Sequence, residues 1–362
     1  MYPQLTINLK KLGQNLDAVA KITRDQGGCS LMIVTKSLCA DEKVVELLIN
    51  DKRVDYLADS RIENLKTYSK KARECGKKTV MMRLPMHCEI PETVEHADLS
   101  FNSEISTIRL LDREAERRGK VHSILLMVDL GDLREGLFYA DEMEIFTMVS
   151  EILKLKNIEL FGIGVNLTCY GAIIPKDDNL SVFAGIAEKI ERKFNIKLQM
   201  LSGGNSSSIY LIWKGGLPKG INNLRLGESF LLGNDTAYGE DVPGTVRDAI
   251  TLEAQIIELR EKPSLPIGEA GLDAFGRKPH YEDRGVIKRA ILAVGKQDID
   301  QDSLTPVDND VEILGSSSDH LILDVTKSGR EYEVGGVVSF SLAYGAVLRA
   351  ATSKYVKKVY VE

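Results

Sequence analysis

Lys36 is the first residue whose type and position point to chemistry. It directly follows the apolar run Ser30–Thr35, which predicts a buried strand. Enzymes built on parallel strands place catalytic residues at the carboxyl ends of those strands. An amine held there among apolar neighbours is suited to form an imine with an aldehyde, because desolvation favours its neutral, nucleophilic form. The position is not specific by itself, since most lysines beyond strands are solvated surface residues.

A turn of small residues supplies a second candidate group. The segment Leu201–Tyr210 reads LSGGNSSSIY, with Ser206 in its middle. Backbone N–H groups in such a turn can bind a phosphate together with a serine hydroxyl. Arg225 and Gly227 lie further along the chain, in the stretch RLGES. A phosphate site near Lys36 would suit an aldehyde cofactor that carries a phosphate, and the alternative is an ordinary connecting loop.

The elements that must position these residues alternate along the chain. Eight strand-like runs precede residue 235, at Ser30–Thr35, Tyr56–Asp59, Thr79–Leu84, Asp98–Asn102, Ser123–Asp129, Leu160–Asn166, Lys197–Leu201 and Leu224–Gly233. Helical patterns separate most of them, at Asp41–Asn50, Ile62–Glu74, Ile105–Arg118, Met143–Leu155 and Leu180–Phe194. Repeated βα units predict a TIM-type (β/α)8 barrel, which often binds phosphate after its seventh and eighth strands. A doubly wound open sheet is the alternative.

The pattern of alternating strand-like and helical runs ends after Asn234. Gly, Pro and Asp punctuate the strand-like runs there, and no helical period is convincing. The runs lie at Leu252–Leu259, Lys288–Val294, Val311–Leu314, Leu321–Val325 and Val337–Ala343. We therefore predict an α/β protein with a barrel domain at residues 1–234 and a smaller β-rich domain at residues 235–362.

Composition limits the class of protein. The chain has 362 residues and a formal net charge of −6, with acidic and basic residues mixed, which argues against nucleic acid or an anionic membrane as a partner. Its start, MYPQLTINLKK, lacks the pattern of a secretory signal, and no apolar run approaches the roughly 18 residues of a membrane span. The five cysteines form no C-x-x-C pair. We expect a cytoplasmic protein with neither disulfides nor a metal site.

The order of the motifs resembles that of the alanine racemase family, the fold type III pyridoxal-phosphate enzymes, and within it the branch that acts on ornithine. The family has a lysine after strand one, D-x-G-x-x-R at strand five, an N-S phosphate turn at strand seven and R-x-G at strand eight. The resemblance covers nearly the whole chain, including Gly315–Val325 in the β-rich part. The matching residues are Lys36, then Asp129, Gly131 and Arg134, then Asn205 and Ser206, then Arg225 and Gly227.

This resemblance implies a pyridoxal 5'-phosphate enzyme in which Lys36 carries the cofactor as a Schiff base. Lys36 would also act as one of two acid/base groups at the α-carbon of an amino acid. Arg225 would hydrogen-bond the pyridine nitrogen, and because an arginine stays protonated it can only donate. The ring nitrogen would then remain unprotonated, and a weaker electron sink restrains decarboxylation and transamination. Ser206 and the backbone amides near Gly227 would hold the phosphate.

The resemblance also implies the remaining cofactor contacts. Arg134 would approach the phenolic oxygen of the cofactor or the substrate carboxylate, with a surface salt bridge as the alternative. The family's histidine behind the pyridine ring is replaced by Asn166. Its phosphate-binding tyrosine appears here as Phe340, which leaves Tyr344 as a stand-in. The predicted cofactor-binding residues are therefore Lys36, Arg134, Asn166, Asn205, Ser206, Arg225, Gly227, Glu228 and Tyr344.

The second acid/base group is the main departure from the family. Alanine racemases use a tyrosine lent by the partner subunit, and in PIGEAGLDAFG it falls at or beside Phe275, whose ring cannot take a proton. Racemisation removes a proton on one face of the α-carbon and delivers one on the other, so a substitute is expected. Asp273 is the first candidate, with Glu269 and Tyr281 behind it, and the protein should be a homodimer. Alternatively, these residues are loop solvation or bind a cationic side chain.

The expected substrate pocket also differs from that of an alanine racemase. Serines at Ser317 and Ser318, followed by Asp319, replace the family's Cys-Met pair. A more polar lining suits a longer substrate, and acids at Asp273 or Asp319 can pair with a terminal ammonium group. We predict interconversion of the L and D forms of a basic amino acid, ornithine first. The alternatives are a racemase of alanine, serine or lysine, a non-catalytic pyridoxal-phosphate carrier, and a decarboxylase with Glu228 at the cofactor.

Overall fold

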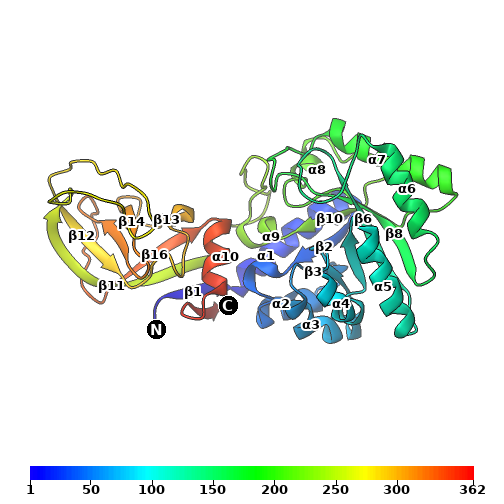
Figure 1. Cartoon of the computed structure of the whole chain (residues 1–362). Helices are drawn as coiled ribbons and strands as arrows, with labels where there is room; N and C mark the ends of the chain where they lie inside the picture. Colours follow the sequence, from blue (N-terminus) through cyan, green and yellow to red (C-terminus); the bar gives the residue numbers. More distant parts are fainter. The chain divides into compact units, whose positions relative to one another are not determined.

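The computed structural model describes residues 1–362 and divides into two compact units (Figure 1). The two units are Leu12–Val246, and Met1–Lys11 together with Arg247–Glu362. This division differs from the predicted boundary at residue 234. Strand β1 (Gln4–Asn8) pairs with β11 (Ile250–Pro263) and with β17 (Lys357–Val361), so the first residues belong to the β-rich unit.

The unit Leu12–Val246 contains a closed ring of eight parallel strands. In ring order they are β2 (Ser30–Val34), β3 (Tyr56–Asp59), β4 (Lys78–Met81), β5 (Leu99–Asn102), β6 (His122–Asp129), β8 (Ile158–Val165), β9 (Met200–Ser202) and β10 (Asn223–Leu226). The ring closes because β10 pairs with β2 and β5 pairs with β6. A short strand, β7 (Leu137–Phe138), pairs with β6 outside the ring. The predicted (β/α)8 barrel is confirmed, and the open-sheet alternative is wrong.

Helices follow most of the barrel strands, and α2 to α5 lie outside the ring in Figure 1. The helices of this part of the chain are α1 (Leu9–Ala20), α2 (Glu42–Asn50), α3 (Ile62–Glu74), α4 (Ile90–His96), α5 (Ile105–Arg117), α6 (Glu142–Ile152), α7 (Asp177–Phe194), α8 (Tyr210–Lys214) and α9 (Glu228–Leu232). The start of α2 is capped by Asp41, whose side chain accepts from the Val44 N–H, as acids at helix starts commonly do. Short helical segments complete this part, a π-helical one at Lys21–Gln26 and 3-10 turns at Lys36–Leu38 and His87–Glu89, and a further 3-10 turn lies in the β-rich unit at Gln301–Ser303.

The eighth predicted strand, Leu224–Gly233, is only partly a strand. β10 ends at Leu226, and α9 begins at Glu228 after Gly227. The run ESFLL is mostly buried in the helix, and a short buried run cannot be told from a strand by its periodicity alone.

Two apolar layers hold the barrel together. A large buried cluster between strands and helices includes Leu126 and Phe183. A smaller cluster, which includes Met32 and Phe101, fills the inside of the ring. Successive side chains of a strand point to opposite faces, so alternate residues of each strand supply the two layers. Arg225, with 1% of its surface exposed, is the largest of the fully buried side chains. A charged side chain is rarely buried without a partner, so its surroundings in the barrel are of functional interest.

The second unit is an eight-stranded sheet, with a helix between its last two strands in the sequence. Besides β1, β11 and β17, its strands are β12 (Val286–Leu292), β13 (Leu304–Pro306), β14 (Glu312–Ser316), β15 (Leu321–Asp324) and β16 (Val337–Leu342). The β-rich prediction is confirmed, but the expectation of no convincing helix is wrong, because α10 (Tyr344–Thr352) follows β16 directly. Its sequence YGAVLRAAT favours a helix, since alanine has the highest helix propensity and the buried residues share one helical face. No helix of the whole structure is long and apolar enough to cross a membrane.

Candidate active site

Lys36 lies just beyond the first strand of the barrel. β2 ends at Val34, and a single 3-10 turn begins at Lys36. The side chain is half-buried, and its amine makes no hydrogen bond or ion pair with another protein group. Cys39 and Ala40, which close the turn, both adopt the left-handed backbone, with φ of 56° and 51°. This conformation costs a non-glycine residue roughly 1–2 kcal/mol, so the surroundings must hold the turn in place.

Arg225 on β10 is buried inside the barrel. Its Nη1 donates to Ser202 Oγ at 2.8 Å, and its Nη2 donates to the Val165 carbonyl at 2.8 Å. The guanidinium carbon lies 5.2 Å from the ring centre of Phe101. Burial lowers the pKa of Arg225 to about 10, so the side chain remains charged at neutral pH. Its Nε has no hydrogen-bond partner, which leaves one buried N–H for an acceptor on a ligand.

The turn after β9 is fixed by its own side chains. Ser208 Oγ donates to the Gly203 carbonyl at 2.8 Å, and the Ser207 N–H donates to Asn205 Oδ1 at 2.8 Å. Gly204 has a φ of +117°, and a Cβ at this position would lie 2.3 Å from Ser208 Oγ. Glycine is therefore required there, both for its backbone conformation and for the close approach of the serine.

Ser206 joins this turn to the start of α9. Its Oγ accepts from the Gly227 N–H at 3.3 Å, the Ser229 N–H at 3.2 Å and the Ser229 hydroxyl at 3.0 Å. A phosphate oxygen would be a stronger acceptor for these donors than a hydroxyl is. A Cβ on Gly227 would lie 3.3 Å from Val34 Cβ, two residues before Lys36. This donor cluster and the lysine are therefore neighbours across β10 and β2.

Three of the predicted residues form a polar cluster at the loops after β6, β8 and β9. Asn205 Nδ2 donates to Asn166 Oδ1 at 3.1 Å and to Cys169 Sγ at 3.3 Å. If the Asn166 amide is turned over, its oxygen accepts instead from both terminal nitrogens of Arg134 at 3.2 Å, and the bond from Asn205 to Asn166 Oδ1 is lost. Arg134 also forms an ion pair with Glu135. The structure thus brings Arg134, Asn166 and Asn205 together, and the surface salt bridge is only one of the contacts of Arg134.

Asp132 is a structural residue of this region that the sequence analysis missed. Its side chain is fully buried, and Oδ2 accepts from the N–H groups of Cys169 at 3.3 Å and Tyr170 at 3.0 Å. Oδ1 accepts from the Ile173 N–H at 3.3 Å. Asp129 likewise accepts two N–H groups of its own loop. The two acids of DLGD therefore shape the loop after β6 and fasten it to the loop after β8, a role that local sequence does not reveal.

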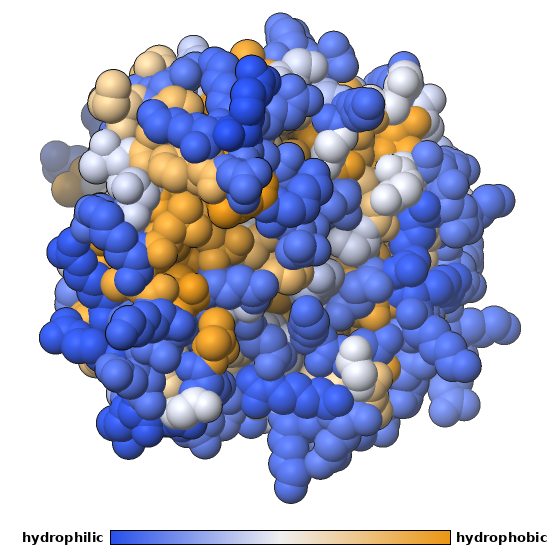
Figure 2. Space-filling model, turned by 90° about the vertical axis from the view of Figure 1, so that its right-hand side faces the viewer, coloured by the Kyte–Doolittle hydropathy of each residue, from blue (hydrophilic) through white to orange (hydrophobic).

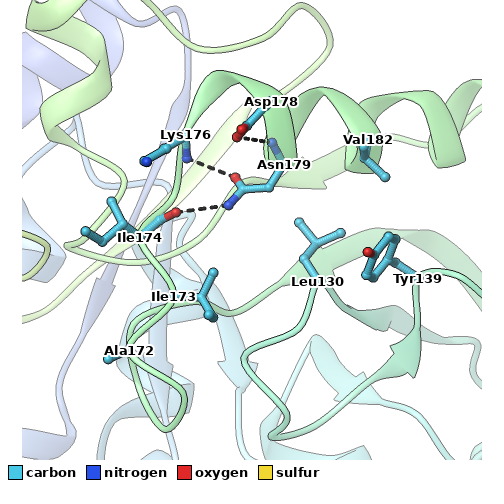
Figure 3. Close-up of a pocket in the computed structure, with 9 residues that line it drawn as sticks. All are labelled: Leu130, Tyr139, Ala172, Ile173, Ile174, Lys176, Asp178, Asn179 and Val182. Atoms are coloured by element: carbon cyan, nitrogen blue, oxygen red, sulfur yellow. Dashed lines mark hydrogen bonds between the residues drawn. The ribbon is translucent and has the colours of Figure 1, made fainter.

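A cavity of about 570 Å³ lies between these two loops and the start of α7 (Figure 3). In Figure 3, Leu130 and Tyr139 line one side of it and Ile173 the other. Asn179 braces the upper edge, where its Nδ2 donates to the Ile174 carbonyl at 2.9 Å. None of the predicted cofactor-binding residues lines this cavity. It shares loops with the candidate site but is lined by other residues, apolar ones together with Lys176, Asp178 and Asn179.

Large apolar side chains are exposed around the same loops. Figure 2 faces the side on which α6 and α7 lie in Figure 1, and it shows a hydrophobic patch among charged residues. Soluble monomers rarely expose large apolar patches, which commonly mark interaction sites. The exposed apolar residues of the two loops and of α6 and α7 are Leu133, Phe138, Met143, Tyr170 and Val182.

Asp273 belongs to the β-rich unit, in the exposed loop between β11 and β12. Its Oδ1 accepts from the N–H groups of Phe275 and Arg277 at 2.8 Å each. The Arg277 N–H above all, assisted by that of Phe275, holds the pKa of Asp273 below its usual value. One carboxylate oxygen thus orders the turn and leaves the other for a further partner. Glu269 and Tyr281 are exposed residues of the same loop.

Two further predicted cofactor contacts lie in different units. Glu228 begins α9 of the barrel unit, and its Oε1 accepts from Asn234 Nδ2 at 3.1 Å. Tyr344 begins α10 of the β-rich unit. In that unit the Ser318 hydroxyl donates to the exposed carboxylate of Asp319 at 2.7 Å. Lys36, Arg134, Arg225 and the turn around Ser206 all belong to the barrel unit.

The barrel groups fit the pyridoxal phosphate expected from the sequence. Lys36 offers an amine without a protein partner at the end of β2. Ser206 and the two N–H groups beside it offer a place for the phosphate at the ends of β9 and β10. Arg225 offers the buried N–H that an unprotonated ring nitrogen can accept. The amine, the phosphate-binding donors and the buried N–H therefore match the aldehyde, the phosphate and the ring nitrogen of the cofactor.

Comparison with known proteins agrees with this geometry. The model of the family "Alanine racemase, N-terminal domain" matches residues 7–234. The chain is 53% identical over 358 residues to an ornithine racemase of Acetoanaerobium sticklandii, and 38% identical over 360 residues to a lysine racemase of Thermotoga maritima, each match covering 99% of both chains. An alanine racemase from Bartonella henselae, solved with covalently bound pyridoxal phosphate, shares the fold with a TM-score of 0.73 at 16% identity, over 100% of both chains. The chain belongs to the alanine racemase family.

Proposed function

We propose that the protein is a pyridoxal-phosphate-dependent racemase that interconverts the L and D forms of a basic amino acid, ornithine first. The observation that carries this proposal is the unpartnered Lys36 amine next to the donor cluster around Ser206, on neighbouring strands of one barrel. The 53% identity to an ornithine racemase along the whole chain supports the same reaction. The cofactor supplies the electron sink that makes the α-proton of the amino acid acidic.

Lys36 and Arg225 carry different parts of this chemistry. Lys36 holds the cofactor aldehyde and moves a proton at one face of the α-carbon, and its lack of an ion-pair partner keeps the amine available for both tasks. Arg225, with a pKa of about 10, stays positive at neutral pH and acts only as a donor to the ring nitrogen. Keeping that nitrogen unprotonated favours proton transfer over decarboxylation. Arg134 and Asn166 lie together where they can bind the phenolic oxygen or the substrate carboxylate.

The second acid/base group comes, in this proposal, from the β-rich unit of a second copy of the chain. Asp273 is the first candidate, because its half-buried carboxylate is held in one orientation by two backbone N–H groups that use only one of its oxygens. The exposed apolar residues of the barrel unit provide a surface for such a homodimer. Mixing Lys36→Ala subunits with Asp273→Asn subunits tests it, since a hybrid dimer has one site with both residues intact. Activity should return on mixing, and two inactive pools that remain inactive would exclude Asp273 as a residue lent by the partner.

The assignment of the cofactor lysine has a direct chemical test. Borohydride reduction of the holoenzyme followed by peptide mapping should place the pyridoxyl label on Lys36. The Lys36→Ala protein, treated in the same way, should carry no label in this peptide. A label on another lysine of the wild-type protein, or no label with cofactor present, would overturn the proposed function.

The preference for ornithine rests on the two relatives, one an ornithine and one a lysine racemase, and on the polar lining at Ser317–Asp319. Incubation of the purified protein with each L-amino acid, followed by chiral chromatography, should give D-ornithine fastest. Turnover of alanine alone would exclude a basic substrate. Carbon dioxide from ornithine would favour the decarboxylase alternative, for which the position of Glu228 beside Arg225 is the only argument.

The proposal includes a cytoplasmic enzyme. None of the five cysteines forms a disulfide, which suits a reducing compartment. Fractionation of the source cells followed by immunoblotting should find the protein in the cytosolic fraction.

A further inference from the structure

Three buried polar side chains lie behind Lys36, between the ends of β2 and β3 and helix α3. They are Thr35, Asp59 and Tyr68, with exposed fractions of 6%, 0% and 4%. Thr35 Oγ1 lies 2.6 Å from Asp59 Oδ2 and 3.1 Å from the Tyr68 hydroxyl. Thr35 is the residue immediately before Lys36, so this buried network is covalently adjacent to the proposed cofactor lysine.

The directions of these hydrogen bonds follow from their donors. The Thr35 hydroxyl has one hydrogen, which it donates to Asp59 Oδ2 rather than to the more distant Ala58 carbonyl at 3.2 Å, so it must accept from Tyr68. Burial raises the pKa of the Asp59 carboxyl, and the hydrogen bond from Thr35 acts in the opposite direction. Burial, and next the charge of Asp59, raise the pKa of Tyr68, which keeps its phenol protonated as a donor. Asp59 Oδ1 accepts from the Arg61 N–H at 2.9 Å and from Asn64 Nδ2 at 3.0 Å. The chain of donors therefore ends in one buried carboxyl group that is held by several neutral partners.

The same threonine holds both ends of the strained turn that contains Lys36. The Thr35 N–H donates to the Ala58 carbonyl of the neighbouring strand at 2.9 Å. The Thr35 carbonyl accepts from the Ala40 N–H at 3.2 Å, so it closes the turn across the left-handed residues Cys39 and Ala40. A left-handed backbone at two successive non-glycine residues persists only where its surroundings impose it. Fixing the Thr35 side chain is a direct way to impose it.

We propose that the Tyr68–Thr35–Asp59 network is a positioning device for Lys36, holding the strained turn so that the lysine amine stays in reach of the cofactor aldehyde. None of the three side chains needs to touch the cofactor, and they act through the backbone of the turn. The inference rests on the proposed function to the extent that Lys36 binds the cofactor. It assigns a task to two buried ionisable groups that the racemase reaction does not use directly.

The chain offers a matched control at the opposite end of the barrel. Thr79 follows the first residue of β4 and is fully buried, and its hydroxyl hydrogen has two acceptors in reach, Asp98 Oδ2 at 2.9 Å and the His96 carbonyl at 2.8 Å. Thr79→Val therefore removes the same threonine–aspartate hydrogen bond from a similar buried setting. It lies at the amino end of its strand, whereas Thr35 follows the carboxyl end of β2.

The first readout separates the lysine from the phosphate site. Full-length protein freed of cofactor is mixed with pyridoxal phosphate, and the absorbance of the Lys36–cofactor bond, formed with loss of water, is followed in time. Thr35→Val should slow this step by about tenfold or more, because displacing a reacting group by about 1 Å can cost a large factor in rate. Pyridoxine phosphate, which has the phosphate but no aldehyde, should bind to Thr35→Val as it does to the wild type. Thr79→Val should match the wild type in both measurements.

The second readout uses the holoenzyme. Thr35→Val should lower kcat while the KM for the amino acid stays within about twofold, since the network positions the lysine and does not contact the substrate. Thr35→Ser keeps the hydroxyl and should restore most of the rate. The proposal is overturned if Thr35→Val behaves like Thr79→Val, or if the serine variant is as slow as the valine variant.

Failure of this inference can be told apart from failure of the proposed function. If borohydride labels Lys36 in the wild type but Thr35→Val and Thr79→Val form the cofactor bond at equal rates, only the positioning role is lost. If Lys36 carries no label, the proposed function itself is wrong, whatever the rates of the two valine variants. Melting temperatures of the two valine variants complete the comparison, because equal melting temperatures with unequal rates exclude a general loss of stability.

Discussion

Arg225 and Ser206, both assigned to the cofactor, are buried in the barrel and tied to neighbouring strands, whereas the candidates for the second acid/base group lie in one largely exposed loop of the β-rich unit. Arg225 is bound to Ser202 and Val165 on two neighbouring strands, and Ser206 is bound to the amides beside Gly227. Asp273 is bound only to backbone groups of its own turn. The barrel unit therefore contains a prearranged place for the cofactor within a single chain. The second acid/base group depends on a loop in which the half-buried Asp273 carboxylate makes hydrogen bonds only within its own turn, with the charge of Lys296 nearby.

This contrast between the barrel and the loop separates the part of the site that one chain fixes by itself from the part that depends on further surroundings. A side chain held by long-range hydrogen bonds keeps its place when neighbouring loops change, because closed strands fix its partners. A side chain in an exposed turn, such as Asp273, is enclosed by an active site only when another chain packs against the turn. Losses caused by changes in the barrel should therefore appear in cofactor binding, while losses in the loop should appear in proton transfer with the cofactor in place.

The largest effect is expected from Lys36→Ala. Racemisation should fall by roughly a thousandfold or more, because both the covalent link and one acid/base group disappear. Chiral chromatography of ornithine measures the rate, and Lys36→Arg, which keeps a positive charge, should be equally inactive. The fold should persist, since the amine has no protein partner. Racemisation by Lys36→Arg at near the wild-type rate would exclude Lys36 as the cofactor-binding and proton-transferring residue.

Asp273→Asn tests the exposed half of the comparison. Asparagine keeps an oxygen for the N–H groups of Phe275 and Arg277 but is a far weaker base, so kcat should fall about a hundredfold with normal cofactor absorbance. Glu269→Gln and Tyr281→Phe are the matched changes in the same loop and should stay within about twofold. A larger loss in either of these two would move the second base to that residue.

Arg225→Lys should lower kcat by roughly thirtyfold. A lysine cannot reach both Ser202 and Val165 with a planar fork, and each buried acceptor left unpaired costs about 2 kcal/mol. Steady-state kinetics and a melting curve measure the two consequences. Ser202→Ala, which removes one of the two acceptors and leaves the guanidinium, should cost less. Equal rates for wild type and Arg225→Lys would mean that the cofactor ring does not depend on this guanidinium.

Ser206→Ala should weaken cofactor binding by about tenfold, because a charge-assisted hydrogen bond to phosphate contributes about 1.5 kcal/mol. Ser30→Ala is the control, since Ser30 begins β2, at the opposite end of the strand from Lys36, and its hydroxyl donates to the Asn222 carbonyl. Fluorescence titration of the cofactor-free proteins gives both dissociation constants. The phosphate assignment is wrong if the two serine variants bind the cofactor equally well.

Much of the barrel half could be predicted, because its signals are local in the sequence. The apolar run before Lys36 and the small-residue turn around Ser206 can each be recognised within about ten consecutive residues. The position of Asp273 in an exposed loop was equally visible. Its hydrogen bonds to the two residues beyond it, which lower its pKa, depend on the conformation of the turn.

What could not be predicted depends on partners far away in the chain. Asp132 holds the loop that begins more than thirty residues later. The network behind Lys36 joins Thr35 to Asp59, which become neighbours only because β2 and β3 pair in parallel register. The strand β1 was missed for the same reason, since its partners are β11 and β17 at the other end of the sequence. Periodicity indicates an element, but it does not name the element that it packs against.

The contrast between buried and exposed polar groups extends to stability, where the smallest effect is expected. His122 on β6 is buried with its Nε2 2.8 Å from Ser100 Oγ, and burial lowers the pKa of His122 from the usual value near 6.5 to about 3. Between these two pH values the unfolded chain binds a proton that the folded chain does not. The free energy of unfolding should therefore fall as the pH falls through this window, by about 1.4 kcal/mol per pH unit.

His122→Gln removes this proton uptake while keeping a side chain that can hydrogen-bond to Ser100. Urea unfolding at pH 6.5 and pH 5 should show that the wild type loses about 2 kcal/mol more than the variant over this interval. His320, an exposed histidine of the β-rich unit, provides the matched change His320→Gln, which should retain the full pH dependence of the wild type. If His122→Gln also retains it, the acid sensitivity does not originate in the buried barrel, and the distinction between the two units does not extend to their stability.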